Sequence, residues 1–391
     1  MSGLDVAAYH HLPTGGALRV LAEWARYTGA ARVTVYTPDP DVHAFAGVPD
    51  RVRVERADVP GPFEGLPAAL GLLRSGPAGR RVAATIDGAG HDVVLVLPSR
   101  LTQSPAVLHH LRTPAVYYAP EAMRSAYEDP RLIFPGDDWK VRVTRAGLNP
   151  IERARRILDR RAARAAPYVM THSEFTRADL RRNYGVDSEV LRLGVDADAV
   201  RPSPPPAGAP PYVLSVGALH PLKGHDLVVE SVARVAADVR PRLVIVGDRG
   251  AEGPALREQA ARRGVDLDLR ESIPFAEVVA LMQGATIVAC AQIREPFGLV
   301  PLEAMACARP VVAVDDGGLR ESVRDEETGL LVARDPDAMA AAFTRLLADP
   351  ALRDRFGAAG RADVEANWRW DRFAADLDAV LARRAALGPR R

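Results

Sequence analysis

The sequence predicts an α/β protein made of two domains, each with a parallel sheet covered by helices. Short apolar runs alternate with helical patterns along most of the chain, which is typical of strands joined by crossover helices. The length of 391 residues suits two domains. Residues 201–211, RPSPPPAGAPP, contain six prolines, and such a run acts as a semi-rigid spacer. We therefore place the first domain at 1–200, a linker at 201–211 and the second domain at 212–367.

Each half contains its own alternating set of elements. In the first half, strands are predicted at 4–9, 32–36, 93–97, 115–118 and 168–171, with helices between them, for example at 17–27 and 151–165. In the second half, strands are predicted at 212–216, 243–246, 286–289, 310–314 and 329–332. Helices are predicted there at 223–236, 253–263, 275–284, 299–308 and 337–348, and a final helix at 368–387. Ligands bind at the carboxyl ends of strands in open α/β sheets, so two such domains can hold one substrate each.

Composition and charge exclude several classes of protein. A net charge of +1 provides no global field for binding nucleic acid. The two cysteines, Cys290 and Cys307, lie in apolar surroundings and have no metal or disulfide spacing. No apolar run approaches the ~20 residues of a membrane span, and the N-terminal stretch lacks the pattern of a signal peptide. We therefore expect a cytoplasmic protein without a membrane span, a bound metal or a nucleic-acid partner.

The segment EPFGLVPLEAMACARP, at 295–310, combines a glycine turn with an apolar helix that contains a carboxylate. The N–H groups of Gly298, Leu299 and Val300 at the start of the predicted helix form a ready anion site. Glu303 lies one turn further in, where an unpaired carboxylate would cost several kcal/mol, so it needs a partner. A ribose diol would suit Glu303, and a second polyol would suit Glu295. Alternatively, Glu303 caps local backbone or pairs with an arginine.

This segment resembles the signature of retaining family 4 glycosyltransferases, which have the GT-B fold of two Rossmann-like domains. The resemblance implies domains that face each other across a cleft and a C-terminal helix, 368–391, that crosses back to the first domain. It also implies that Glu295 holds hydroxyls of the donor sugar, that Glu303 holds the nucleotide ribose, and that backbone at 298–300 binds sugar and diphosphate. Ala308 stands where the family has glycine. The matching residues are Glu295, Phe297, Gly298, Leu299, Glu303, Ala304, Met305, Ala306, Pro310, Val311 and Val312.

One of only two lysines in the chain, Lys223, lies in SVGALHPLKG, which resembles the segment that opens the family's second domain. Lys223 takes the position of the phosphate-binding lysine, where a fixed cation stabilises the charge of a leaving diphosphate. The family's arginine position is Ala218, so either Arg249 or Arg294 replaces that contact or binding is weaker. The pair Gly317 and Gly318 suits a close approach to the donor, or a simple turn. The resemblance implies a wider donor site that includes Gly217, Phe297, Ile273 and Arg249.

The acceptor side is expected in the first half. Residues from the first strand and the next loop, His10, His11, Gly15 and Gly16, lie where the family places the floor of the cleft, although the histidines are equally consistent with structural roles. Pro120 stands where relatives often have a histidine near the reacting carbon. Glu121 and Arg124 are candidate acceptor ligands or a solvated pair, and Ser99 and Arg100 form a plausible rim. Eight arginines at 142–164 indicate a basic surface for a membrane or acidic acceptor, or a solvated amphipathic helix.

These features predict an enzyme that moves a sugar from a nucleoside diphosphate sugar, UDP- or GDP-linked, to a small-molecule or natural-product acceptor. The resemblance implies retention of anomeric configuration without a metal or bound cofactor, with Glu295 and Lys223 as the catalytic residues. Ala218 and Pro120 leave open a nucleotide-binding protein without catalysis. An epimerase or phosphorylase on the same scaffold, or a peripheral-membrane enzyme acting on lipid or glycan, are further alternatives.

Overall fold

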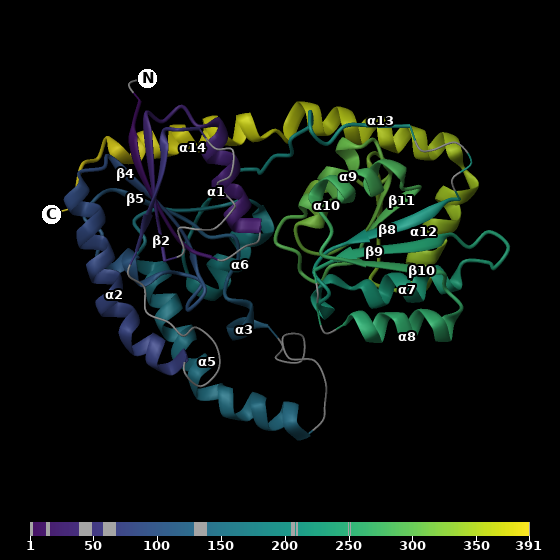
Figure 1. The fold of residues 1–391 in the computed structure, drawn as a ribbon, viewed down its shortest axis with the longest axis horizontal. Helices are drawn as coiled ribbons and strands as arrows, with labels where there is room; N and C mark the ends of the chain where they lie inside the picture. The colour runs from purple at the N-terminus through teal and green to yellow at the C-terminus, as the bar shows by residue number, and fades with distance from the viewer. Residues whose placement is uncertain are drawn as a thin grey trace. The chain divides into compact units, whose positions relative to one another are not determined.

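The computed structural model describes residues 3–12, 16–38, 49–57, 68–128, 139–204, 208, 210–248, 250 and 252–390, with side chains at 68–70 and 139–149 left aside. The chain folds into two compact units, each built around one sheet (Figure 1). Unit 1 contains Met1–Leu193 together with Trp370–Arg391, and unit 2 contains Gly194–Arg369. The chain therefore crosses between the units twice.

The sheet of unit 1 has seven parallel strands in the order β3-β2-β1-β4-β5-β6-β7. Its register places Ala8 of β1 beside Val35 of β2 and Leu95 of β4. The five strands predicted in the first half are confirmed, and two further strands, β3 and β7, form the edges. The strands are β1 (Asp5–His11), β2 (Arg32–Thr37), β3 (Val52–Arg56), β4 (Val93–Ser99), β5 (Ala115–Tyr118), β6 (Val169–Thr171) and β7 (Glu189–Val190).

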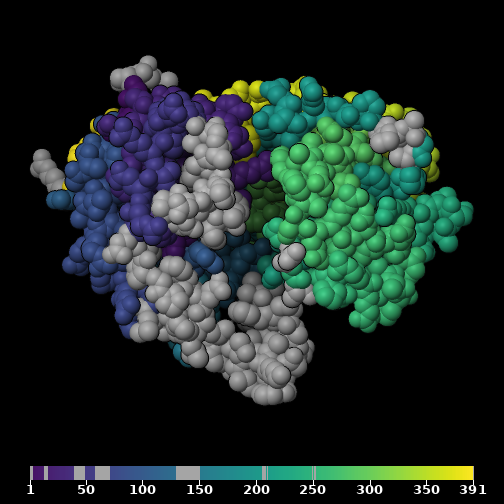
Figure 2. Space-filling view, in the orientation of Figure 1, coloured from purple at the N-terminus to yellow at the C-terminus, as the bar shows by residue number. Residues whose placement is uncertain are grey.

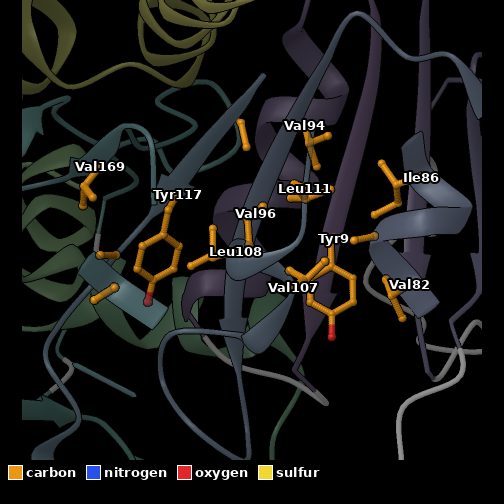
Figure 3. Close-up of a cluster of buried hydrophobic side chains, with 14 of the residues drawn as sticks. Tyr9, Val82, Ile86, Val94, Val96, Val107, Leu108, Leu111, Tyr117 and Val169 are labelled. Carbon is orange, nitrogen blue, oxygen red and sulfur yellow. The ribbon is translucent and has the colours of Figure 1, made fainter. Parts of the chain in front are cut away.

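Helices cover the sheet of unit 1 because their apolar faces are buried against it. Figure 3 shows one such contact, in which Val82 and Ile86 of one helix pack with Val107 and Leu108 against strand residues such as Val96. The helix predicted at 151–165 is longer than expected, since it starts at Trp139 and contains Pro150 in its interior. The helices are α1 (Gly16–Tyr27), α2 (Ala68–Ala89), η2 (Ala106–His109), α3 (Arg124–Tyr127), α5 (Trp139–Ala165), α6 (Glu174–Tyr184) and α14 (Trp370–Ala385).

The C-terminal helix α14 is attached to the rest of unit 1 by a partly buried polar contact. The carboxylate of Asp378 accepts hydrogen bonds from Trp24 Nε1 (2.8 Å), Thr28 Oγ1 (2.6 Å) and Gly29 N (2.7 Å) at the end of α1. Phe373 and Leu377 of the same helix are buried. These contacts explain why the last segment of the chain folds with the first unit.

The sheet of unit 2 has six parallel strands in the order β10-β9-β8-β11-β12-β13. The five strands predicted in the second half are confirmed, and β10 is an additional edge strand. The strands are β8 (Tyr212–Val216), β9 (Arg242–Gly247), β10 (Leu267–Glu271), β11 (Ile287–Cys290), β12 (Val311–Val314) and β13 (Gly329–Val332). The helices are η3 (Pro221–Lys223), α7 (His225–Arg234), α8 (Gly253–Arg263), α9 (Phe275–Gly284), α10 (Leu299–Ala306), α11 (Leu319–Ser322), α12 (Pro336–Ala348) and α13 (Pro350–Asn367).

In both sheets the first strand of the chain is central. The next two strands are added on one side of it, and all later strands are added on the other side. The strand order therefore reverses between β1 and β4 in unit 1 and between β8 and β11 in unit 2. In open α/β sheets, such a switch point opens a crevice at the carboxyl ends of the two strands, where ligands bind. The fold thus provides one binding position in each unit.

The structure differs from the sequence prediction at the boundary between the halves. The units separate at Leu193–Gly194, ahead of the proline-rich run. Two carbonyl oxygens at the start of that run are held by unit 2, since Arg201 O accepts from Gln283 Nε2 and Ser203 O accepts from Arg309 Nη2, each at 2.8 Å. Within the described part of the chain, no helix is long and apolar enough to cross a membrane.

Candidate functional site

An ion pair marks the switch point of unit 2. Lys223 follows β8, Glu295 follows β11, and Lys223 Nζ lies 2.8 Å from Glu295 Oε2. The lysine side chain is 28% exposed and the glutamate side chain 17% exposed, so both reach solvent while their charges are partly desolvated. The two residues that the sequence analysis singled out for catalysis are thus brought together from positions 72 residues apart.

Local backbone structure explains where Lys223 lies. A helix was predicted to begin at this residue, but Lys223 instead ends the 3₁₀ helix η3, and α7 begins only after Gly224. Gly224 has a φ of +68°, and a Cβ atom there would overlap the carbonyl oxygen of Ala291 at the end of β11. The left-handed residue and this close approach break the helix and bring Lys223 to the end of the neighbouring strand.

The turn that carries Glu295 is supported by the glycine pair after β12. Gly318 N donates to Glu295 O at 2.7 Å, and a Cβ atom at Gly318 would lie 2.6 Å from Pro296 O. Gly317 has a φ of +59°, and its Cβ would lie 2.5 Å from Glu295 O. The sequence analysis expected these glycines to approach the donor or to form a simple turn, and the structure shows them in close contact with the backbone of the Glu295 turn.

The helix α10 begins directly after this turn. Gly298 occupies its N-cap with a φ of +101°. Because glycine has no side chain, this residue cannot accept a capping hydrogen bond from the N–H groups of the first turn. Leu299 and Val300 form the first turn, followed by Pro301, which has no N–H to lose. The positive end of the helix dipole therefore points toward the region of the Lys223–Glu295 pair, which suits an anion.

Glu303 lies one turn into α10 and is only 4% exposed. Its charge acts on the thiol of Cys290, as do the charges of Lys223 and Glu295. Burial raises the pKa of Cys290, the charges of Glu295 and Glu303 raise it further, and Lys223 opposes the rise. Cys290 ends β11, so the three charged side chains share one neighbourhood at the switch point.

Other predicted donor residues have different surroundings. Phe297 is buried and packs edge-on against Trp368, with 5.7 Å between ring centroids. Gly217 follows β8, where a Cβ atom would lie 3.3 Å from Lys223 Cγ. Ile273 is half-buried just after β10, and Arg249 lies outside the described residues.

Sequence reasoning missed Arg334, which follows β13. Its guanidinium donates to the carbonyl oxygen of Ala291, beside Gly224, while the residue as a whole remains exposed. Burial lowers the pKa of Arg334, while Asp226 and Asp316 oppose that shift. No motif signalled this residue, because its contact with the end of β11 depends on packing between strands.

In unit 1, His11 and Ser99 meet at the switch point between β1 and β4. His11 Nδ1 lies 3.1 Å from Ser99 Oγ, which also accepts from Leu101 N at 3.2 Å. Burial, with a smaller contribution from the charge of Arg100, lowers the pKa of His11 to about 4. His11 is therefore neutral at pH 7. The structure therefore brings together two candidates of the acceptor side, His11 and Ser99.

The remaining candidates on the acceptor side have other surroundings. His10 is fully buried, and its Nδ1 accepts from Leu12 N at 3.2 Å. Gly16 is the first residue of α1, and Gly15 lies outside the described residues. Arg124 pairs with Glu128 at 2.9 Å and reaches Glu121 at 4.0 Å, so its charge is shared by two carboxylates.

A second buried pair in unit 1 was not predicted. Tyr118 ends β5, His172 follows β6, and the tyrosine hydroxyl lies 2.8 Å from His172 Nδ1. Burial, together with the charge of Glu121, raises the pKa of Tyr118, so the phenol stays protonated. The two residues lie in stretches whose strand ends were predicted, but their pairing follows only from the order of strands in the sheet. Among the described residues, no cluster of His, Cys, Asp and Glu is arranged to hold a metal ion.

Two Rossmann-like units, each with a reversed strand order, and a lysine–carboxylate pair beside a helix N-terminus define the GT-B class. The family described as "Glycosyltransferase Family 4" matches residues 14–199, and the one described as "Glycosyl transferases group 1" matches residues 196–363. Together the two matches span both units. The chain belongs to the family 4 glycosyltransferases.

Curated relatives and solved structures agree with this assignment. The chain is 34% identical to D-inositol 3-phosphate glycosyltransferase of Streptomyces bingchenggensis, over 60% of this chain and 57% of the relative. It is 32% identical to alpha-maltose-1-phosphate synthase of Mycolicibacterium smegmatis, over 56% of this chain and 63% of the relative. Each match spans less than two thirds of the relative's length.

Two solved structures are similar over nearly the whole chain. Sucrose-phosphate synthase from Thermosynechococcus elongatus has a TM-score of 0.76 at 21% identity, covering 98% of this chain and 100% of that chain. Anabaena HepE in complex with UDP and glucose has a TM-score of 0.71 at 20% identity, covering 97% and 100%. These similarities establish the fold.

Proposed function

We propose that this chain is a glycosyltransferase that binds a nucleoside diphosphate sugar at the switch point of unit 2 and transfers the sugar to an acceptor bound by unit 1. The ion pair between Lys223 and Glu295, beside the N-terminus of α10, is the observation that carries the proposal. It offers a cation and helix N–H groups for a diphosphate, and a carboxylate for sugar hydroxyls.

The reaction needs stabilisation of the negative charge that develops on the diphosphate. The bond between the anomeric carbon and the diphosphate oxygen breaks, and its electron pair goes to the diphosphate. The acceptor hydroxyl oxygen bonds to the same carbon from the same face, and its proton passes to the leaving oxygen. Lys223 and the first-turn N–H groups of α10 are placed to offset the new charge, so no metal is required in this scheme. Configuration is retained because attack and departure use one face.

Glu303 is assigned to the ribose of the donor. Its carboxylate is buried and lies in the neighbourhood of Cys290, Glu295 and Lys223. A buried carboxylate that accepts hydrogen bonds from a diol contributes affinity, because hydrogen bonds to charged groups are worth about 1.5–3 kcal/mol each. Glu295 then acts mainly on the sugar, and Glu303 acts mainly on nucleotide affinity.

The acceptor is proposed to bind at the switch point of unit 1, where neutral His11 and Ser99 offer hydrogen-bonding atoms to a hydroxyl. The names of two curated relatives, D-inositol 3-phosphate glycosyltransferase and alpha-maltose-1-phosphate synthase, refer to small polar molecules. The structurally similar HepE was solved in complex with UDP and glucose, which supports a UDP-linked donor here, with GDP as the alternative. We therefore propose a small-molecule acceptor.

Nucleotide binding provides the first test. Thermal unfolding is measured with UDP, GDP, ADP and TDP, since a ligand at 100 times its Kd adds about 2.7 kcal/mol of stability. One nucleotide should stabilise the protein, and Glu303→Gln should weaken its binding by about tenfold or more. Glu258→Gln, at a side chain that is 72% exposed in the same unit, is the matched control and should bind normally.

Measuring turnover distinguishes an enzyme from a nucleotide-binding protein without catalysis. The sequence left the second alternative open because of Ala218 and Pro120. The wild-type protein should release nucleoside diphosphate from the matching nucleotide sugar, slowly with water and faster with a suitable acceptor. Nucleotide binding without any release would support the non-catalytic alternative. Absence of stabilisation by all four nucleotides would refute the proposed donor site.

A further inference from the structure

An apolar groove lies on unit 1, beside the candidate acceptor site. It has a volume of about 570 Å³ and lies between α2, η2 and α5, which pack against one another. Figure 1 shows α2 and α5 side by side in unit 1. A volume of this size is typical of small-molecule sites, which span about 300–1,000 Å³. The walls are formed mainly by Leu72, Leu73, Ile151, Ala154, Leu158 and Ala162.

The groove leaves apolar side chains at the surface. Leu73 on its wall is 78% exposed, and Ile157 on the neighbouring α5 is 48% exposed. Residues of α2 (blue) form part of the surface of unit 1 in Figure 2. Covering such side chains with an apolar ligand is favourable because it removes their surface from water.

One end of the groove is formed by the loop that follows Ser99, the last residue of β4. Thr102 and Ser104 of that loop line the groove, and three residues of chain span at most about 10 Å, so Thr102 lies within reach of Ser99. A small cavity of about 20 Å³ touches Tyr9 and Ser99 and shares Thr102 and Ala106 with the groove. The polar end of the groove and the His11–Ser99 pair are therefore neighbours.

The helix α5, which forms one wall of the groove, carries a net positive charge, while none of the described residues that line the groove is an arginine or a lysine. Between Pro150 and Ala165, α5 contains six arginines against two acids, Glu152 and Asp159. Asp159 is fully buried, where its carboxylate accepts from Ser104 N at 2.6 Å, so it offers little charge to the surface. Arg155 also connects α5 to the loop after β4, because its Nε donates to Leu101 O at 2.8 Å.

We propose that the groove holds the apolar chain of the acceptor, so that the substrate is an anionic amphiphile. Its hydroxyl-bearing head lies at His11 and Ser99, and its alkyl or acyl chain lies between α2 and α5. This inference rests on the proposed function, and it narrows the acceptor from a small molecule in general to one with a single apolar chain. The arginines of α5 supply the complementary charge.

Calorimetric titration with n-alkyl phosphates from hexyl to dodecyl, each kept below its micellar concentration, tests the groove without any donor. Each buried methylene contributes about 0.8 kcal/mol, so the Kd should fall about fourfold per methylene until the groove is filled. Ala154→Glu places a charge in the groove at an exposed helical position and should weaken dodecyl phosphate binding at least tenfold. Ala84→Glu, at an exposed position of α2 outside the groove lining, is the matched control and should bind as the wild type does.

The outcomes separate this inference from the proposed function. A Kd that is independent of chain length, or an Ala154→Glu variant that binds normally, would overturn the inference. Binding to anionic vesicles without binding of monomeric alkyl phosphates would also overturn it, in favour of a membrane-facing surface. Nucleotide stabilisation is measured on the same variants and should be unchanged. Failure of alkyl binding with intact nucleotide binding would remove only the groove assignment, whereas loss of nucleotide binding in the wild type would refute the donor site.

Discussion

Replacing Gly318 with alanine should disturb the turn that holds Glu295. A Cβ atom at this position would lie 2.6 Å from Pro296 O and 2.7 Å from Phe297 Cα. Carbon–oxygen contacts in proteins rarely close below about 3.3 Å, so the turn must move by about 0.7 Å. Overpacking of this kind typically costs about 1–3 kcal/mol. Because a displacement of about 1 Å in a catalytic group can cost about 10²-fold in rate, turnover should fall at least tenfold.

Urea denaturation and release of nucleoside diphosphate measure the two effects of Gly318→Ala separately. Gly88→Ala is the matched control, because Gly88 lies in α2 and a Cβ atom there would meet no heavy atom within 4 Å. This control should be as stable as the wild type or up to about 1 kcal/mol more stable, with normal turnover. A Gly318→Ala variant with wild-type stability and wild-type turnover would show that the glycine pair does not position Glu295.

Three further substitutions test other features. Ala308 has a φ of +54°, where glycine is favoured, so Ala308→Gly should raise the urea midpoint by an amount equivalent to about 0.5–1 kcal/mol, and a lower midpoint would refute this. The pKa of His11 is lowered from 6.5 to about 4, so its contribution to stability is complete above pH 6.5 and is lost as pH falls toward 4. The wild type should therefore lose about 2 kcal/mol more stability than His11→Asn between pH 7.5 and 5, and parallel profiles would contradict this. In Asp378→Asn, the side-chain NH₂ group replaces one carboxylate oxygen, so one of the three donors at the end of α1 loses its acceptor. The substitution should lower the free energy of unfolding in urea by about 2 kcal/mol. An unchanged urea midpoint would mean that this contact does not hold α14.

Most strands were predicted because central strands of a parallel sheet are buried on both faces. The run predicted at 115–118 coincides with β5, whose four residues are all buried. The strands that escaped prediction, β3, β7 and β10, are all edge strands. Their sequences mix charged and apolar residues, as in VRVER and LDLRE, because an edge strand is only partly covered. A continuous apolar run therefore identifies the middle of such a sheet better than its edges.

The site was predictable where its parts are adjacent in sequence. The turn at Gly298, the helix after it and the buried Glu303 lie within one short segment, and the physical argument for an anion site needed only that segment. The pairing of Lys223 with Glu295 depended on resemblance to a family, since 72 residues separate them. The Arg334 contact and the apolar groove required the packing of distant elements, which no local pattern encodes.

Release of nucleoside diphosphate by wild type and by Lys223→Ala tests the central claim most directly. The measurement uses UDP- and GDP-linked sugars at saturating concentration, with Lys140→Ala, the substitution of the other lysine in the chain, as a control. We expect kcat to fall about 10²-fold or more in Lys223→Ala and to stay unchanged in the control, because a cation that offsets developing charge acts mainly in the transition state. Equal rates for Lys223→Ala and the wild type would contradict the assignment of Lys223 to the leaving diphosphate.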